Sequence, residues 1–139
     1  MKIVVDNKIW VAYLLSKEPK VEKLIKLINK GDLTLLLSKE VLGDLADLLK
    51  LAPVSKLLDK KLIESFINLL VQKSTIIKVN ALVEGKTSQK DQPYAELAID
   101  GKAQFLITPK SEFSRFEKLD GYKLINVIEL KNFINNFEV

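Results

Sequence analysis

The stretch Lys2-Ile3-Val4-Val5-Asp6 places three consecutive β-branched residues directly before an aspartate. Because the run is apolar at successive positions and does not alternate, it predicts a strand buried on both faces, as in a parallel sheet. Parallel strands need helical crossovers between them, so helical patterns are expected to follow. Ligands of open parallel sheets bind outside the carboxyl ends of the strands, which makes Asp6 the first candidate site residue.

The rest of the chain repeats this alternation of short apolar runs and helical patterns. Further strands are predicted at 33–37, 74–79, 104–108 and 124–127, and helices at 9–15, 19–29, 38–51, 54–72, 93–100 and from 129 onward. Ser38 is the expected N-cap of the third helix, and residues 80–90 read as a loop of functional length. The pattern predicts an α/β fold, a three-layer α/β/α sandwich with a central parallel sheet of four to five strands.

Length and composition restrict the chemistry. The 139 residues, 15.7 kDa and 47% apolar, correspond to one domain, 1–139. The chain has no Cys and no His, which excludes disulfides, thiolate nucleophiles, imidazole bases and Cys- or His-ligated metals. Carboxylate, lysine, hydroxyl and amide chemistry remain.

The charge balance indicates a weak attraction to polyanions. The net charge is +4, and Arg115 is the only arginine among the 22 basic residues. This argues against a module that reads bases through arginine. The lysines either contact an RNA backbone or only keep the protein soluble, and the sequence leaves both interpretations open. No apolar run approaches the ~20 residues of a membrane span, and the N-terminus does not resemble a signal peptide, so we expect a cytoplasmic protein with no membrane partner.

Carboxylates follow or border several of the predicted strands. Asp6 follows the first, Asp44 lies in the helix after the second, Asp91 begins the helix before the fourth, and Glu112 follows the fourth. Carboxylates that converge repel one another unless a cation joins them. Hard oxygen ligands without His or Cys suit Mg²⁺ or Mn²⁺, and such an ion activates water for phosphodiester hydrolysis.

Five blocks of the sequence, taken in order, resemble those of the PIN-domain nucleases. They are 1–10 (MKIVVDNKIW), 37–45 (LSKEVLGDL), 88–98 (SQKDQPYAELA), 101–113 (GKAQFLITPKSEF) and 127–133 (VIELKNF). The resemblance spans nearly the whole chain and implies an endoribonuclease that depends on Mg²⁺ or Mn²⁺. It makes Asp6, Asp44 and Asp91 the catalytic, metal-binding triad. Glu112 is not at the family's fourth acidic position but lies near it, and we consider it as a further carboxylate for the metal. Many small members of the family are toxins of toxin–antitoxin pairs, which implies an RNA substrate, an antitoxin partner and a homodimer.

The chain departs from the family pattern at several positions beside the site. Lys110 stands where the fourth block usually has an acidic residue, Asn7-Lys8 replaces the usual polar pair, and Asp44 is one methylene shorter than the usual glutamate. Lys110 either takes the place of a metal ion or contacts the scissile phosphate, and the sequence leaves both open. Thr108 is expected to act as a turn residue or to hold a water.

Structural roles compete with these assignments. Asp6 and Asp91 are also good helix N-caps, and Asp44 also fits a solvated helix position. The apolar residues of 54–71 fit either the core or an interface. A receiver domain is disfavoured, because Asn80 stands where its phosphate-accepting aspartate would be. The rival function is a catalytically impaired PIN-like binding module in which Lys8 and Lys110 weaken the metal site.

Overall fold

The computed structural model describes residues 1–51, 53–83 and 85–137 and contains a five-stranded parallel sheet. The strand order is β3-β2-β1-β4-β5, and every pairing is parallel. The strands are β1 (Lys2–Val5), β2 (Thr34–Leu37), β3 (Ser74–Ile76), β4 (Phe105–Thr108) and β5 (Asn126–Glu129). The predicted α/β/α sandwich with a parallel sheet is confirmed.

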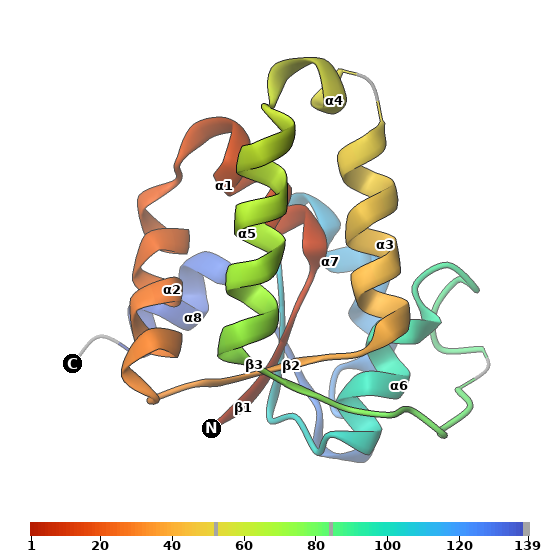
Figure 1. Ribbon diagram of the computed structural model, residues 1–139. Coiled ribbons are helices and arrows are strands. Elements are labelled where there is room, and N and C mark those ends of the chain that lie inside the picture. Colours follow the sequence, from red (N-terminus) through yellow and green to blue (C-terminus); the bar gives the residue numbers. More distant parts are fainter. Residues whose placement is uncertain (52, 84, 138–139) are drawn as a thin grey trace.

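Helices cover both faces of this sheet (Figure 1). They are α1 (Asn7–Ser16), α2 (Pro19–Lys30), α3 (Lys39–Lys50), α4 (Val54–Leu57), α5 (Lys60–Lys73), α6 (Gln92–Asp100), α7 (Phe113–Phe116) and α8 (Leu130–Phe137). Helices α1, α2, α3 and α5 lie on one side, and α6 lies on the opposite side, where it packs on β1, β2 and β4. Ser38 caps α3 as predicted, because its Oγ accepts from the Val41 backbone N–H at 3.1 Å.

The chain changes direction across the sheet between β1 and β4. It moves outward from β1 through β2 to β3, and then returns through α6 to place β4 on the other side of β1. A crevice forms at such a switch point, outside the carboxyl ends of the two strands. The two strands end at Val5 and Thr108, and the Asp6 backbone N–H donates to the Ile107 carbonyl at 2.8 Å.

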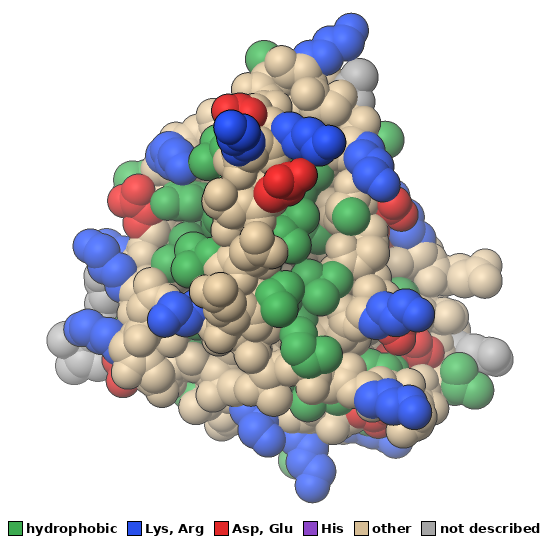
Figure 2. All heavy atoms as spheres, in the orientation of Figure 1, with side chains coloured by type: hydrophobic (Ala, Val, Ile, Leu, Met, Phe, Trp, Pro, Cys, Tyr) green, Lys and Arg blue, Asp and Glu red, His purple; other side chains and the backbone are tan. Residues whose placement is uncertain are grey.

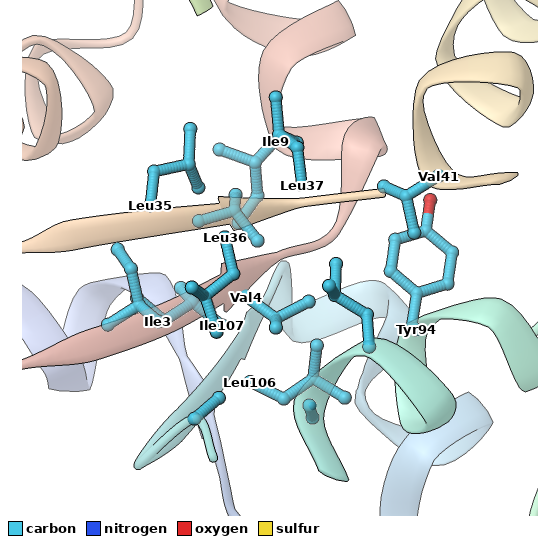
Figure 3. Close-up of a cluster of buried hydrophobic side chains, with 14 of the residues drawn as sticks. Ile3, Val4, Ile9, Leu35, Leu36, Leu37, Val41, Tyr94, Leu106 and Ile107 are labelled. Atoms are coloured by element: carbon cyan, nitrogen blue, oxygen red, sulfur yellow. The ribbon is translucent and has the colours of Figure 1, made fainter. Parts of the chain in front are cut away.

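The core lies between the sheet and its helices, and Figure 3 shows the apolar side chains of the central strands within it. Ile3, Leu35 and Leu106 are each 0% exposed, as expected for strands covered on both faces. Tyr94 reaches from α6 past the strand ends, so that its hydroxyl lies beside Val41 of α3 (Figure 3). This aromatic side chain therefore joins the core to the carboxyl edge of the sheet.

Residues 109–123 differ most from the sequence-based expectation, which leaves them without regular structure. They form 3₁₀ turns at Lys110–Glu112, Glu117–Leu119 and Tyr122–Leu124, with α7 between the first two. Lys123 and Leu124 both have positive φ angles, which end the extended run, so β5 begins at Asn126 and not at Leu124. The strand predicted at 74–79 ends early, at Ile76. Residues 80–90 show no helix or strand in their described part, and residue 84 lies outside it.

One face of the molecule combines apolar and basic side chains (Figure 2). Hydrophobic side chains gather in its middle, and lysines surround them. A groove of about 410 Å³ runs between α3 and the α4–α5 segment, with Leu49, Ile63 and Ile67 in its lining. Phe66 and Leu70 of α5 are buried in the core, while Leu57 of α4 is 68% exposed. Residues 54–71 therefore supply both core and surface. No helix in the described ranges is long and apolar enough to cross a membrane.

Candidate functional site

Asp6 occupies the switch point of the sheet and is 0% exposed. Its Oδ1 accepts from the Lys8 backbone N–H at 3.0 Å, so the carboxylate caps helix α1. Its Oδ2 accepts from the Thr108 hydroxyl at 3.0 Å and from Arg115 Nη1 at 3.1 Å. The capping role and the site role of Asp6 are thus compatible, because they use different oxygens.

Asp91 reaches the same place from the opposite face of the sheet. It precedes α6 at the N-cap position, but its side chain makes no capping hydrogen bond. Instead, its Oδ2 accepts from the Ser88 hydroxyl at 2.9 Å and from Arg115 Nε at 3.2 Å, and its Oδ1 accepts from Arg115 Nη2. The expected N-cap hydrogen bond is therefore absent, because the carboxylate is directed to Arg115.

Arg115 of α7 lies among three carboxylates. Its Nε and Nη2 bind Asp91 as a fork, and its Nη1 bridges Asp6 Oδ2 and, at 3.3 Å, Glu112 Oε2. Such a bidentate arrangement is the strongest geometry of a guanidinium with a carboxylate. The Arg115 side chain is 20% exposed, and its Cζ lies 4.8 Å from the ring centroid of Phe116.

Glu112 connects Arg115 to a second cation. Its Oε1 accepts from Lys8 Nζ at 2.8 Å, while its Oε2 accepts from Arg115 one turn further along the chain. Lys8 belongs to α1, so this pair ties the 3₁₀ turn after β4 to the helix after β1. The ion pairs therefore form a chain in which Lys8 binds Glu112, Glu112 binds Arg115, and Arg115 binds Asp6 and Asp91.

Asp44 lies beside this cluster with partners of its own. Its Oδ2 accepts from the Tyr94 hydroxyl at 2.5 Å and from Asn7 Nδ2 at 3.1 Å. The same Asn7 amide donates to the Val41 carbonyl at 2.8 Å, and the Asn7 backbone N–H donates to the Tyr94 hydroxyl at 3.3 Å. One set of hydrogen bonds thereby joins the carboxyl edge of β1 to the first turns of α3 and α6.

These side chains surround a cleft of about 290 Å³. Its lining is formed by Lys8, Asp44, Leu48, Ser88, Lys90, Asp91 and Arg115. A second hollow of about 340 Å³ adjoins it, shares Ser88 and Arg115, and adds Lys86 and Lys118. Three cationic side chains line the first cleft beside two carboxylates, so its walls offer places for phosphate oxygens as well as for cations.

The protonation of the cluster follows from burial and from Arg115. Burial raises the pKa of Asp6, and the opposing effects of the Lys8 amide and of Arg115 do not cancel this. Burial also favours a higher pKa for Asp91 and Glu112, but their partners outweigh it. Hydrogen bonds from Arg115 and Ser88 lower the pKa of Asp91. Lys8 and Arg115 lower the pKa of Glu112. Burial opposes the charge of Arg115, yet its three carboxylate partners raise its pKa. The Tyr94 pKa is raised by burial and by its hydrogen bond to Asp44.

The residues predicted to share a site do lie together. Asp44 and Asp91 line one cleft, and Asp6 and Glu112 contact the Arg115 that lines it. Asn7 and Lys8 bind Asp44 and Glu112, and Thr108 is buried and bound to Asp6. Lys110 is exposed and forms no ion pair among the residues that the structure describes. The cation that contacts Asp6 and Asp91 is Arg115, and Glu112 binds both Arg115 and Lys8.

Three participants were not predicted from the sequence: Arg115, Tyr94 and Ser88. From the sequence, Arg115 counts only as the lone arginine, which argues against base reading, although its position three residues after Glu112 places both on one side of a helical turn. Tyr94 has no predicted role in the site. Its location one turn after Asp91, at the start of a helix, was the available signal for a site role.

The carboxylates of the site have the donor chemistry of a divalent-ion site but not its arrangement. Their oxygens are the donors that Mg²⁺ and Mn²⁺ prefer, and a cation, the guanidinium, already joins Asp6 to Asp91. As they stand, however, no three acidic side chains of the described residues converge closely enough to hold a metal ion. Asp44 is bound to Tyr94 and Asn7, while Asp6 Oδ2, both Asp91 oxygens and Glu112 Oε2 accept from Arg115. The donor chemistry fits a divalent ion, but the arrangement does not fit one while Arg115 is in place.

Comparison with known proteins places the chain in a family and matches its fold. The family model of the PIN domain matches residues 2–109. A solved structure, VapBC2 from Rickettsia felis bound to a DNA fragment from their promoter, contains a chain of similar fold, with a TM-score of 0.60 and 20% identity. The match covers 93% of this chain and 98% of that one. No curated protein matches. The matched segment contains β1, the switch point and most of the cleft, and the chain belongs to the PIN domain family.

Proposed function

We propose that this protein is an endoribonuclease of the PIN type and the toxin of a toxin–antitoxin pair. The observation that carries the proposal is that Asp44 and Asp91 line one cleft at the switch point of the sheet, while the buried Asp6 shares Arg115 with Asp91. Membership of the PIN domain family supports it, because the family consists largely of nucleases. The lysines of the cleft support an RNA substrate rather than a neutral one.

The residues of the cleft divide into two groups in this proposal. Lys8 and Lys90 bind phosphate oxygens of the RNA backbone, because they line the cleft and Lys90 is exposed at its mouth. Once Arg115 is displaced, Asp6, Asp44 and Asp91 would hold Mg²⁺ or Mn²⁺, which when bound supplies a water activated for attack on phosphorus. Tyr94 and Asn7 orient Asp44 through their hydrogen bonds to its Oδ2. Thr108 does the same for Asp6.

The proposal is tested by RNA cleavage. Labelled single-stranded RNA is incubated with the wild type at millimolar Mg²⁺ or Mn²⁺, and we expect cleavage that chelation by EDTA abolishes. Asp6→Asn keeps an N-cap for α1 and is expected to lose the activity. Lys131→Gln, an exposed position in α8, serves as the matched control and is expected to retain it. If the wild type and Asp6→Asn leave the RNA equally intact, the enzyme assignment fails.

A second function, a PIN-like module that binds RNA without cleaving it, is favoured by one observation. Arg115 neutralises the carboxylates that the nuclease needs, and it leaves Lys8 and Lys90 on the walls of the cleft. This module would bind RNA in EDTA as tightly as in Mg²⁺, and the binding would weaken steeply with salt. Retention of RNA by the wild type without any cleavage would select this function over the nuclease.

The partners in this proposal are an antitoxin and a second copy of the chain, and the protein acts in the cytoplasm. The fold shared with VapBC2 from Rickettsia felis supports the antitoxin. The groove between α3 and the α4–α5 segment supports an apolar contact between macromolecules. Light scattering after size exclusion tests the homodimer, with a mass near twice 15.7 kDa as the expected result. A monomer at all concentrations would remove the dimer from the proposal.

A further inference from the structure

Arg115 uses most of its hydrogen-bonding capacity on the carboxylates of the site. A guanidinium has five N–H donors. Four contacts from Arg115 reach acidic side chains: two to Asp91, one to Asp6 and one to Glu112. Apart from Phe116, no other side chain of the described residues is recorded against this guanidinium. Its position is thus defined by the carboxylates that would otherwise bind a metal ion.

The carboxylates need a cation in this position. Asp6 is completely buried and Asp91 nearly so, at 6% exposure. Both are held to one point of the carboxyl edge by Thr108 and Ser88. Two buried carboxylates around one point repel each other strongly in a medium of low polarity, and either a guanidinium or a divalent ion relieves this repulsion. Arg115 occupies Asp6 Oδ2 and both Asp91 oxygens, so a divalent ion that used these oxygens would have to take its place.

The backbone that carries Arg115 is fixed next to the site. Phe116, its neighbour in α7, is 0% exposed and packs edge-on against Tyr94, with 5.5 Å between ring centroids. Glu112, in the turn before α7, binds Lys8 of α1. These contacts keep α7 at the carboxyl edge, so Arg115 cannot leave by movement of the whole segment without exposing Phe116. For another cation to replace the guanidinium, the Arg115 side chain must therefore rotate away from the carboxylates. The adjoining hollow of about 340 Å³, which Arg115 also lines, offers the space for this rotation.

We propose that Arg115 is the resident cation of this site and that it competes with divalent ions for Asp6 and Asp91. The inference rests on the proposed function only in taking these carboxylates as the metal ligands. It assigns to the wild type a resting state that is folded and charge-balanced without metal. Divalent ions bind this state weakly, because each bound ion must first displace a guanidinium that makes four hydrogen bonds.

The test is Mn²⁺ binding to the wild type, Arg115→Gln and Lys131→Gln. The two variants lose the same charge, but only the first opens the carboxylate site. Binding is followed by the Mn²⁺ electron paramagnetic resonance signal and by the Mn²⁺-dependent rise in melting temperature. We expect the affinity of Arg115→Gln to exceed that of the wild type by about tenfold or more, and Lys131→Gln to match the wild type. Equal Mn²⁺ affinity in the wild type and Arg115→Gln would overturn the proposal.

A further pair of variants locates the new binding site and allows for poor folding. Arg115→Gln combined with Asp6→Asn is expected to lose the gain in Mn²⁺ affinity, and retention of the gain would also overturn the proposal. If Arg115→Gln folds only with Mn²⁺ present, that dependence is itself the predicted exchange of one cation for another. Arg115→Lys keeps a charge without the fork, and it is expected to bind Mn²⁺ with intermediate affinity.

These measurements separate this proposal from the proposed function. If Arg115→Gln gains Mn²⁺ affinity but neither protein cleaves RNA, the competition holds and the nuclease assignment fails. If the wild type cleaves RNA and binds Mn²⁺ as tightly as Arg115→Gln, the nuclease assignment holds and the competition fails.

Discussion

At the scale of residues, the site is a charge-balanced cluster in which one arginine contacts three acids. Asp6, Asp91 and Glu112 come from three separate elements, and Arg115 binds all of them. Removing one partner of a buried ion pair is costly, since it leaves the remaining charges without compensation. The stability of this region and its affinity for cations therefore depend on the same four side chains.

Arg115→Gln is expected to lower the free energy of unfolding in EDTA by about 3 kcal/mol, the lower end for a broken buried pair, because Arg115 is partly exposed. Urea unfolding of the variant and of the wild type measures this cost. Lys131→Gln, which removes a solvated charge of α8, is expected to change stability by less than about 0.5 kcal/mol. A cost for Arg115→Gln no larger than this control would show that the ion pairs contribute nothing.

The pH dependence of stability distinguishes Asp91 from Asp6. Because the pKa of Asp91 is lowered in the fold, its ionised form adds stability above the ordinary Asp value of 3.8, and this is lost as the pH falls through the lowered value. The pKa of Asp6 is raised, so its ionisation removes stability as the pH rises from 3.8 to the raised value.

Asp91→Asn and Asp6→Asn, unfolded in urea at a series of pH values, test this contrast. The stability deficit of Asp91→Asn relative to the wild type is expected to shrink below pH 3.8. The stability of Asp6→Asn relative to the wild type is expected to improve as the pH rises above 3.8. The same trend with pH in both variants would contradict the assignment of opposite pKa shifts.

At the scale of elements, the site depends on connections between helices that follow different strands. Tyr94 of α6 donates to Asp44 of α3, while Asn7 of α1 donates to both Asp44 and the Val41 carbonyl. These bonds fix the starts of three helices relative to one another at the carboxyl edge of the sheet. The orientation of Asp44 in the cleft is therefore set by α6 and α1 as much as by its own helix.

Tyr94→Phe is expected to cost about 1–2 kcal/mol of folding stability, because it leaves Asp44 and the Asn7 N–H short of a partner without changing the ring. Tyr122→Phe is the matched control: among the described residues its hydroxyl has no recorded hydrogen bond, and the change is expected to be nearly neutral. Urea unfolding compares the two variants. Equal effects would show that the Tyr94 hydroxyl does not connect the helices.

The elements also show which parts of the structure the sequence could predict. Runs such as Ile3-Val4-Val5 and Phe105-Leu106-Ile107 predict strands because buried parallel strands are continuously apolar. An aspartate that follows such a run, as Asp6 does, could be assigned to the carboxyl edge of the sheet, because parallel strands all end at that edge. The segment 109–123 could not be predicted, since 3₁₀ turns and a four-residue helix are too short to show a hydrophobic period. Arg115 lies in that segment, and its partners Asp6 and Asp91 are distant in sequence.

At the scale of the whole molecule, the topology explains why distant residues meet. The crossover through α6 brings Asp91 back to the edge beside Asp6, and the turn after β4 brings Glu112 and Arg115 to the same edge. Lysines line the cleft and the adjoining hollow on either side of this cluster. The fold of this chain thus presents an acidic centre, closed by an arginine, within basic surroundings.

The most direct measurement of this arrangement is a double-mutant cycle between Asp6 and Arg115, which are 109 positions apart in sequence. The unfolding free energies of the wild type, Asp6→Asn, Arg115→Gln and the double variant are measured in urea with EDTA. Because the two side chains share an ion pair within one cluster, we expect a coupling energy above about 1 kcal/mol. Additivity within about 0.3–0.5 kcal/mol, as found for distant and independent sites, would contradict the central claim that Arg115 is the cation bound to the site's carboxylates.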